Sequence, residues 1–261
     1  MADKITAPSL RSMRTANKKI VCITAYDACF GALADEAGAD LILVGDSVGN
    51  VMLGYTSTVP VTLQEMVHHT RATRQGVKRA LLVADLPFGT YESSPSVAMD
   101  SAVALMRAGA EAVKLEGDYP EAVAALTKAG IPVMGHLGMT PQSVNRFGGH
   151  RVQGKGASSE RLLEEAKSLD AAGVFACVLE LVPAAVASHI TEEVSYPTIG
   201  IGAGPCCSGQ IQVLHDVLGL GDHVFKHAKP FMTGRQLTID AIRAYTEEVR
   251  ASKFPGQEHS S

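Results

Sequence analysis

The chain alternates short apolar runs with longer amphipathic stretches, and polar or glycine-containing turns separate the two. The runs have the length and β-branched content of strands, and the stretches repeat their apolar residues with helical spacing. The predicted strands are Ile20–Ala25, Leu41–Gly45, Ala80–Ala84, Ala112–Leu115, Pro132–Gly135, Phe175–Leu181, Pro197–Ile201 and a weaker eighth at His223–Phe225. The predicted helices include Leu63–Arg74, Ser96–Ala108, Glu121–Ala129, Glu160–Ala172 and Ala184–Glu193.

The predicted strands are apolar throughout, which is typical of parallel strands that helices cover on both faces. Eight strand–helix units in about 250 residues is the size of a (β/α)8 barrel, so an α/β TIM barrel is the predicted fold class. A doubly wound open sheet is the competing architecture, but it usually carries a nucleotide-binding fingerprint. The sequence GIGAG at 200–204 lacks that spacing, and the P-loop-like stretch at 149–155 continues with Gly156 instead of Ser or Thr.

Glycines follow several of the predicted helices. Gly76, Gly109, Gly130 and Gly173 each come just after the last helical turn. A helix that ends on glycine commonly adopts a left-handed backbone conformation at that residue. We therefore expect a positive φ at all four positions.

Composition narrows the class of protein. The chain has 261 residues, 46% of them hydrophobic, which suits a single domain over residues 1–261. Its net charge of -4 gives no electrostatic reason for a nucleic-acid partner. The N-terminus lacks the apolar core of a signal peptide, and no apolar run approaches the ~18 residues of a membrane span. Five cysteines without a CxxC pair indicate a reducing compartment, so we expect a cytoplasmic protein that does not enter a membrane.

Acidic residues recur where the predicted strands end. Asp27, Asp46, Asp85 and Glu116 follow the first four strands, and in a barrel these ends converge on the functional face. Any one of them could instead cap a helix. Several carboxylates around one pocket, however, would repel one another unless a cation neutralised them. Oxygen ligands from neighbouring strands favour a hard cation such as Mg²⁺ over zinc.

Three further side chains at strand ends could carry chemistry. Lys114 lies two residues before Glu116, so both point to the same side of the strand, into the barrel. The lysine could hold an anionic substrate, form a Schiff base, or pair structurally with the carboxylates. His136 could orient a substrate oxygen or be a core histidine. Glu180 lies in an apolar run, where a carboxylate is either a general base or the partner of a buried cation.

Eight segments carry a recognisable pattern. They are ITAYD (23–27), LVGDSVGN (43–50), ADLPF (84–88), VKLEG (113–117), GHLGMTPQSVNRFGGHRVQGKG (135–156), LELVP (179–183), IGIGAG (199–204) and FPGQEHS (254–260). Together they resemble the ketopantoate hydroxymethyltransferase family, in the same order along the chain, and the long fifth segment is highly specific. The resemblance implies a (β/α)8 barrel related to the phosphoenolpyruvate/pyruvate enzymes, which uses Mg²⁺ and assembles as a homodecamer.

The resemblance also implies an activity. Enzymes of the family transfer a hydroxymethyl unit from 5,10-methylenetetrahydrofolate to 3-methyl-2-oxobutanoate through a Mg²⁺-stabilised enolate, giving 2-dehydropantoate for pantothenate biosynthesis. By position in the quoted segments, Glu180 matches the catalytic proton acceptor. The metal-site carboxylates match Asp46, Asp85 and Glu116. The substrate-binding positions match Asp46, Ser47, Asp85, Lys114 and His136.

One stretch departs from the family pattern. After GIGAG the family usually continues to Asp-Gly-Gln, whereas this chain has Pro205-Cys206-Cys207-Ser208-Gly209-Gln210. The departure touches none of the matched site residues, so it concerns the local loop and the folate contacts. Cys206 and Cys207 are adjacent and have no histidine placed to activate a nucleophile, so we predict that neither is catalytic.

Two other functions are compatible with a barrel of this kind. The first is a Mg²⁺-dependent carbon–carbon or phosphorus–carbon lyase of the same superfamily, which shares the enolate chemistry. The second is a barrel that binds a metabolite without converting it. The presence of Lys114, Glu116 and Glu180 together disfavours the second, because binding alone needs no buried base.

Overall fold

The structure, a computed structural model, describes residues 3–260. Among these residues, eight parallel strands pair in chain order and close into a barrel, with β8 hydrogen-bonded to β1. The strands are β1 Ile20–Thr24, β2 Leu41–Val44, β3 Leu81–Asp85, β4 Ala112–Lys114, β5 Val133–Gly138, β6 Ala176–Glu180, β7 Thr198–Ile201 and β8 Gly209–Gln212. The predicted (β/α)8 barrel is therefore confirmed, and β1 to β7 lie on the stronger apolar runs.

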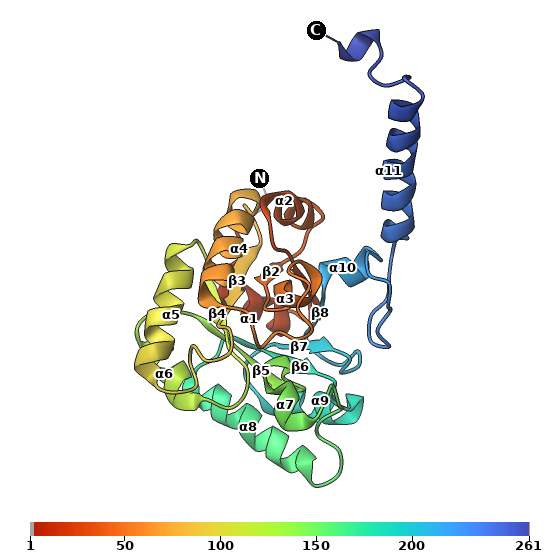
Figure 1. Ribbon diagram of the computed structural model, residues 1–261. Coiled ribbons are helices and arrows are strands. Elements are labelled where there is room, and N and C mark those ends of the chain that lie inside the picture. Colours follow the sequence, from red (N-terminus) through yellow and green to blue (C-terminus); the bar gives the residue numbers. More distant parts are fainter. Residues whose placement is uncertain (1–2, 261) are drawn as a thin grey trace. The chain divides into compact units, whose positions relative to one another are not determined.

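Helices follow the strands and surround the barrel (Figure 1). They are α1 Ala7–Thr15, α2 Ala28–Glu36, α3 Val48–Val51, α4 Leu63–Gly76, α5 Pro95–Arg107, α6 Pro120–Lys128, the 3-10 helix η1 Pro141–Ser143, α7 Val144–Phe147, α8 Ser158–Ala172 and α9 Ala184–Glu193. Each of the five predicted helices is present within one turn of its expected ends. Local sequence sets their starts: at α4, Thr62 and Glu65 accept hydrogen bonds from each other's backbone N–H, at 3.2 and 2.7 Å.

The predicted eighth strand is wrong. Residues 223–225 form no strand, and the barrel closes instead through β8, Gly209–Gln212. This segment reads GQIQ and alternates buried with more exposed residues, so it has no continuous apolar run that the pattern could detect. Gly209 is needed for closure, because a Cβ there would overlap the carbonyl oxygen of Ile20 in β1. The departure from the family pattern ends at Ser208 and leaves β8 intact.

Three of the four predicted cap glycines have a positive φ: 110° at Gly109, 86° at Gly130 and 97° at Gly173. The prediction is wrong for Gly76, which is the last residue of α4 and lies outside the positive-φ set. Gly76 serves close packing instead. A Cβ there would overlap the carbonyl oxygen of Ala28, so its absence lets α2 and α4 approach each other.

Two apolar layers build the barrel. Outside it, a large cluster fills the space between the strands and the covering helices. Inside it, the first residues of several strands, among them Leu41 and Leu81, pack with Leu10 of α1. Arg14 of α1 also donates to the carbonyl of Tyr196 at 2.5 Å. Helix α1 therefore closes the N-terminal end of the barrel with apolar side chains, and charged side chains gather at the carboxyl ends of the strands.

Residues from Leu214 onward form a second compact unit. It contains α10 Leu214–Val217, α11 Gly234–Arg250 and the 3-10 helix η2 Gln257–His259. Every residue of α11 is described, and within it only Gly234 is buried. A single domain over residues 1–261 therefore stays a prediction. Nowhere in residues 3–260 is a helix long and apolar enough to cross a bilayer.

Candidate active site

The strand ends bring the predicted site residues together inside the mouth of the barrel. Asp46 and Ser47 follow β2, Asp85 ends β3, Lys114 ends β4 with Glu116 just beyond, His136 lies in β5 and Glu180 ends β6. The five most buried of these side chains are charged or titratable and at most 4% exposed: Asp46, Asp85, Lys114, Glu116 and His136. Such burial requires each charge to have a partner.

Lys114 pairs with the carboxylates on both sides of it. Asp85 and Lys114 are neighbours in the β3–β4 register, and Lys114 Nζ lies 2.6 Å from Asp85 Oδ1. The same ammonium lies 3.7 Å from Glu116 Oε1. The other oxygen of Asp85, Oδ2, accepts a hydrogen bond from the backbone N–H of Asp46 at 3.0 Å. Three successive strand ends are thereby joined through one lysine and one aspartate.

His136 continues this chain of contacts to the fourth carboxylate. Its Nδ1 lies 3.1 Å from Glu116 Oε1, and its Nε2 lies 3.3 Å from Glu180 Oε2. The side chain of Glu180 is 13% exposed, against 4% for His136, so Glu180 is the member of the chain that reaches furthest toward solvent. A ligand entering the mouth can therefore meet the Glu180 carboxylate.

Burial and the neighbouring charges shift the pKa values of this cluster. Burial, together with the nearby charges of Glu116 and Asp85, raises the pKa of Asp46 to about 7. Burial also raises the pKa of Asp85, against the opposing effect of Lys114. Burial alone would lower the pKa of His136, but the Glu116 carboxylate outweighs it and raises that pKa to about 9. The two carboxylates beside β2 and β3 are thus short of positive charge, which is the condition that a bound cation would relieve.

Comparison with known proteins gives the site its context. The sequence profile described as ketopantoate hydroxymethyltransferase matches residues 4–257. The chain belongs to the ketopantoate hydroxymethyltransferase family. It is accordingly an enzyme, and a transferase.

Curated relatives of the same family align over almost the whole chain. A protein of Aeropyrum pernix is 52% identical, with 98% of this chain and 94% of the relative covered. A protein of Carboxydothermus hydrogenoformans is 51% identical, with 99% and 95% covered. Both are named 3-methyl-2-oxobutanoate hydroxymethyltransferase, which ties the family to pantothenate biosynthesis.

Solved structures with a similar fold are much less similar in sequence than these relatives. Phosphonopyruvate hydrolase, crystallised with oxalate and Mg²⁺, is 13% identical with a TM-score of 0.64, and 98% of this chain and 93% of that chain are covered. A 2,3-dimethylmalate lyase of the PEP mutase/isocitrate lyase superfamily is 16% identical with a TM-score of 0.60, and 96% and 89% are covered. These structures show that the barrel of this chain has the same overall fold as those two enzymes.

Two residues of this hydroxymethyltransferase site were missed by sequence reasoning. Gln142 Nε2 donates to Asp46 Oδ2 at 3.0 Å, and the Gln142 backbone N–H donates to Glu116 Oε2 at 2.9 Å. Tyr91 donates from its hydroxyl to Gln142 Oε1 at 2.7 Å. Gln142 lies in the most specific of the quoted segments, which was the available signal. An amide carries no titratable group, so the pattern of charges at the strand ends does not point to it.

Of the two polar side chains that follow β1, Tyr26 faces the site and Asp27 does not. The Tyr26 hydroxyl and Ser47 Oγ share a hydrogen bond of 2.9 Å at the mouth of the barrel. Asp27 caps α2 instead, and its Oδ1 accepts from the Phe30 N–H at 2.8 Å. The helix-capping alternative is therefore correct for Asp27 and leaves Asp46, Asp85 and Glu116 as the acidic cluster.

The oxygens of this cluster fit a hard cation that takes few ligands from protein. Asp46 Oδ2 is held by Gln142, and within residues 3–260 no hydrogen bond reaches Asp46 Oδ1. Both oxygens of Glu116 are already engaged, by His136 and by Gln142. No three His, Cys, Asp or Glu side chains of the described chain are arranged as a complete metal site. Mg²⁺ typically binds through one or two carboxylates and completes its shell with water or substrate, which suits Asp46 and Asp85.

Proposed function

We propose that this chain transfers a hydroxymethyl unit from 5,10-methylenetetrahydrofolate to 3-methyl-2-oxobutanoate and so forms 2-dehydropantoate. The observation that carries the proposal is the continuous chain of buried polar contacts from Asp46 through Lys114 and His136 to Glu180. In this proposal Asp46 and Asp85 form the cation-binding end of that chain, and Glu180 forms its proton-accepting end. Both ends are needed to remove a proton from the carbon beside a keto group.

The first end would hold the 2-oxoacid. Mg²⁺, held by Asp46 and Asp85 with Glu116 as the third acidic group, would supply Lewis-acid polarisation of the keto group. Lys114 contributes a positive charge for the anionic substrate, and Ser47 Oγ offers a hydrogen bond to its carboxylate. Because Lys114 is already paired with Asp85 at 2.6 Å, we favour this binding role over a Schiff base.

The second end would move the proton. Glu180 takes the proton from C3 of the oxoacid, and His136 fixes the direction of that carboxylate through its Nε2. The enolate carbon then forms a bond to the methylene carbon of the folate, and both C–N bonds of that methylene break in the overall reaction. Water supplies the hydroxyl group of the product, and its remaining proton together with the proton taken from C3 restores the two N–H groups of tetrahydrofolate. Glu116 holds the other ring nitrogen of His136, Nδ1, at 3.1 Å. The histidine is thus fixed from both sides and keeps Glu180 in position.

Solvent deuterium exchange at C3 of 3-methyl-2-oxobutanoate tests the proposal, because it needs no folate. Glu180→Gln keeps the shape of the side chain and removes the base, so we expect exchange to fall about 10²–10⁴-fold while the protein stays folded. Glu164→Gln, an exposed glutamate on α8, is the matched control and should exchange at the wild-type rate. Wild-type exchange in Glu180→Gln would assign the proton to another group and overturn this role.

We further propose that the protein is a cytoplasmic homodecamer. Support for self-association comes from α11, which carries exposed apolar side chains over most of its length: Leu237, Ile242, Tyr245 and Val249. Exposed apolar stripes of this kind mark surfaces that are covered in an assembly.

A further inference from the structure

The mouth of the barrel has a charged half and an apolar half. The charged and titratable side chains of the site, from Asp46 to Glu180, all lie in or just after β2 to β6. The strands β7, β8, β1 and β2 are described in full, and none of their residues is charged. β2 therefore lies at one boundary between the two halves, and β6, which ends with Glu180, lies at the other.

Ile201 is the apolar side chain next to Glu180. The two residues are register partners across the β6–β7 pair, so their side chains point to the same side of the sheet. Glu180 points into the barrel, because its carboxylate lies 3.3 Å from His136 Nε2. Ile201 accordingly belongs to the apolar cluster inside the barrel. A group that meets the Glu180 carboxylate in the mouth therefore lies beside the Ile201 side chain.

Ile201 is also within reach of a ligand. It is 8% exposed, whereas the other strand residues of the inner cluster are at most 4% exposed. Ile199 pairs with Gly209 across β7–β8. Ile201 and Ile211, each two residues further along, therefore point inward side by side. Together they form an apolar wall in the mouth, next to the proposed base.

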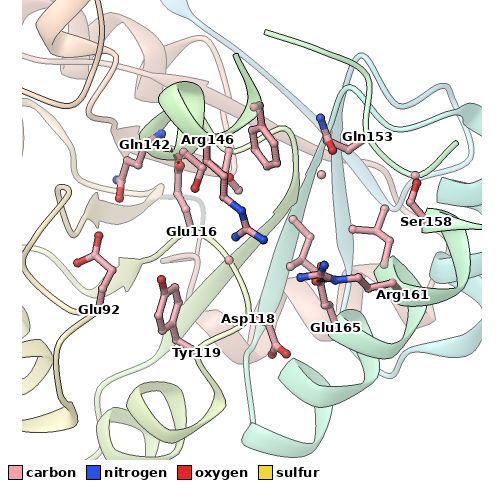
Figure 2. Close-up of a pocket in the computed structure, with 18 of the residues that line it drawn as sticks. Glu92, Glu116, Asp118, Tyr119, Gln142, Arg146, Gln153, Ser158, Arg161 and Glu165 are labelled. Carbon is pink, nitrogen blue, oxygen red and sulfur yellow. Dashed lines mark hydrogen bonds and ion pairs between the residues drawn. The ribbon is translucent and has the colours of Figure 1, made fainter. Parts of the chain in front are cut away.

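The space on the other side of Glu180 has a different lining. Gly138, the register partner of Glu180 on β5, borders a cavity of about 410 Å³. Four carboxylates line this cavity (Figure 2): Glu92, Glu116, Asp118 and Glu165. Arg161 lines it as well and is held by Glu165 at 2.9 Å. Charged groups need water or a polar partner, so an alkyl group is stabilised more against the isoleucine wall than in this cavity.

We infer that Ile201 selects the substituents at C3 of the oxoacid, by packing against the two methyl groups of 3-methyl-2-oxobutanoate. The inference rests on the proposed function, because it takes that oxoacid as the substrate. The molecule has a polar head, made of the carboxylate and the keto group, and an apolar isopropyl tail that begins at C3. Glu180, which would take the C3 proton, lies where the charged half of the mouth meets the apolar half. With the head at Asp46, Asp85 and Lys114, the tail meets Ile201.

Ile201→Ala should change the selectivity of the full-length protein between two oxoacids. The probes are 3-methyl-2-oxobutanoate and 3-methyl-2-oxopentanoate, whose tail is longer by one methylene. Solvent deuterium exchange at C3 with Mg²⁺ gives kcat/KM for both without folate. The shortened side chain loses contact with the shorter tail and makes room for the longer one. We expect the ratio of the two kcat/KM values to shift about 10-fold toward the longer oxoacid, because one methylene in an apolar pocket is worth about 10–200-fold. Calorimetric Kd values should shift in the same direction.

Ile190→Ala is the matched control. It makes the same truncation at a fully buried isoleucine of α9, in the cluster outside the barrel. It should therefore cost stability and leave the ratio of the two oxoacids at the wild-type value. Ile201→Val is a smaller change that the fold tolerates more easily, and it should shift the ratio in the same direction as Ile201→Ala by a smaller factor.

The outcomes separate the inference from the proposed function. An unchanged ratio in both Ile201 variants, or an equal shift in Ile190→Ala, would overturn the inference and leave the proposed function standing. A wild-type protein that exchanges the C3 proton of neither oxoacid would overturn the proposed function, and the inference with it.

Discussion

Gln142 holds two members of the acidic cluster, Glu116 through its backbone N–H and Asp46 through its side chain. Its amide nitrogen donates to Asp46 Oδ2 and to the Leu86 carbonyl, both at 3.0 Å, and its amide oxygen accepts from Tyr91. A buried amide with both ends engaged fixes the rotation of the carboxylate that it touches. Asp46 is thereby turned so that its second oxygen is available to a ligand.

Substitution of Gln142 by Ala should release Asp46 without removing any charge. We expect the affinity for Mg²⁺, measured by calorimetry, to fall about 10-fold. The free energy of unfolding should fall by about 1–3 kcal/mol, because buried groups of Asp46, Leu86 and Tyr91 each lose a hydrogen bond. Gln75→Ala, at an exposed position on α4, is the control. Unchanged Mg²⁺ affinity in Gln142→Ala would show that Asp46 does not need this support.

His136 should make stability depend on pH. Its pKa is raised from the ordinary 6.5 to about 9, so the folded protein binds a proton that the unfolded chain has lost over this range. The stabilisation is complete below pH 6.5 and is lost as the pH rises through 9, a change of about 3 kcal/mol.

Urea unfolding in EDTA at several pH values between 6.5 and 9 measures this slope. We expect wild-type stability to fall across the range and His136→Gln to lack that fall, whatever its absolute stability. His189→Gln, an exposed histidine on α9, should keep the wild-type slope. Equal slopes in wild type and His136→Gln would contradict a charged His136 at neutral pH.

At the scale of elements, close approach of backbones decides where the chain needs glycine. Gly76 and Gly209 sit where two elements touch, and a Cβ at either would overlap a carbonyl oxygen of the neighbour. Gly130 differs, because it has a positive φ and open space around its Cα. Substitutions at these glycines should therefore have different effects.

Gly76→Ala should destabilise the protein by about 1–3 kcal/mol, the usual range for overpacking, because α2 must move away from α4. Gly130→Asn should be nearly neutral, since asparagine tolerates a left-handed conformation and meets no neighbour. Thermal unfolding of both variants compares the two mechanisms. A larger loss in Gly130→Asn than in Gly76→Ala would mean that backbone conformation matters more than contact.

Features that local sequence determines could be predicted, whereas features that depend on contacts between distant residues could not. Apolar runs predict β2 to β7 because those strands are almost wholly buried, and β1 because its more exposed positions, Val21 and Ile23, are also apolar. Charges after the runs predict Asp46, Asp85 and Glu116. β8 is half exposed and rich in glutamine, so its position follows only from its neighbours β1 and β7. Gln142 acquires its role from a partner 96 residues away, which no local pattern contains.

At the scale of the whole molecule, the apolar side chains of α11 bear on assembly. Ile242 and Tyr245 are 60% and 58% exposed, which is unusual for side chains so apolar. Light scattering at micromolar concentration should give the mass of a decamer. Ile242→Glu with Tyr245→Glu should lower that mass, while Glu247→Gln, an exposed polar control on the same helix, should not. A monomer in the wild type would refute self-association.

The pairing of β8 with β1 also has a consequence for synthesis on the ribosome. Residues 20–23 of β1 pair with residues 209–212 of β8. During synthesis, this edge of β1 therefore cannot pair until the last strand of the barrel has been made. At ~5–20 residues per second, that wait is on the order of 10 s or more. During it, one edge of β1 presents unpaired backbone groups to the crowded interior of the cell. Nascent chains of this enzyme are therefore most open to chaperones, and to mispairing with one another, until Gln212 has left the exit tunnel.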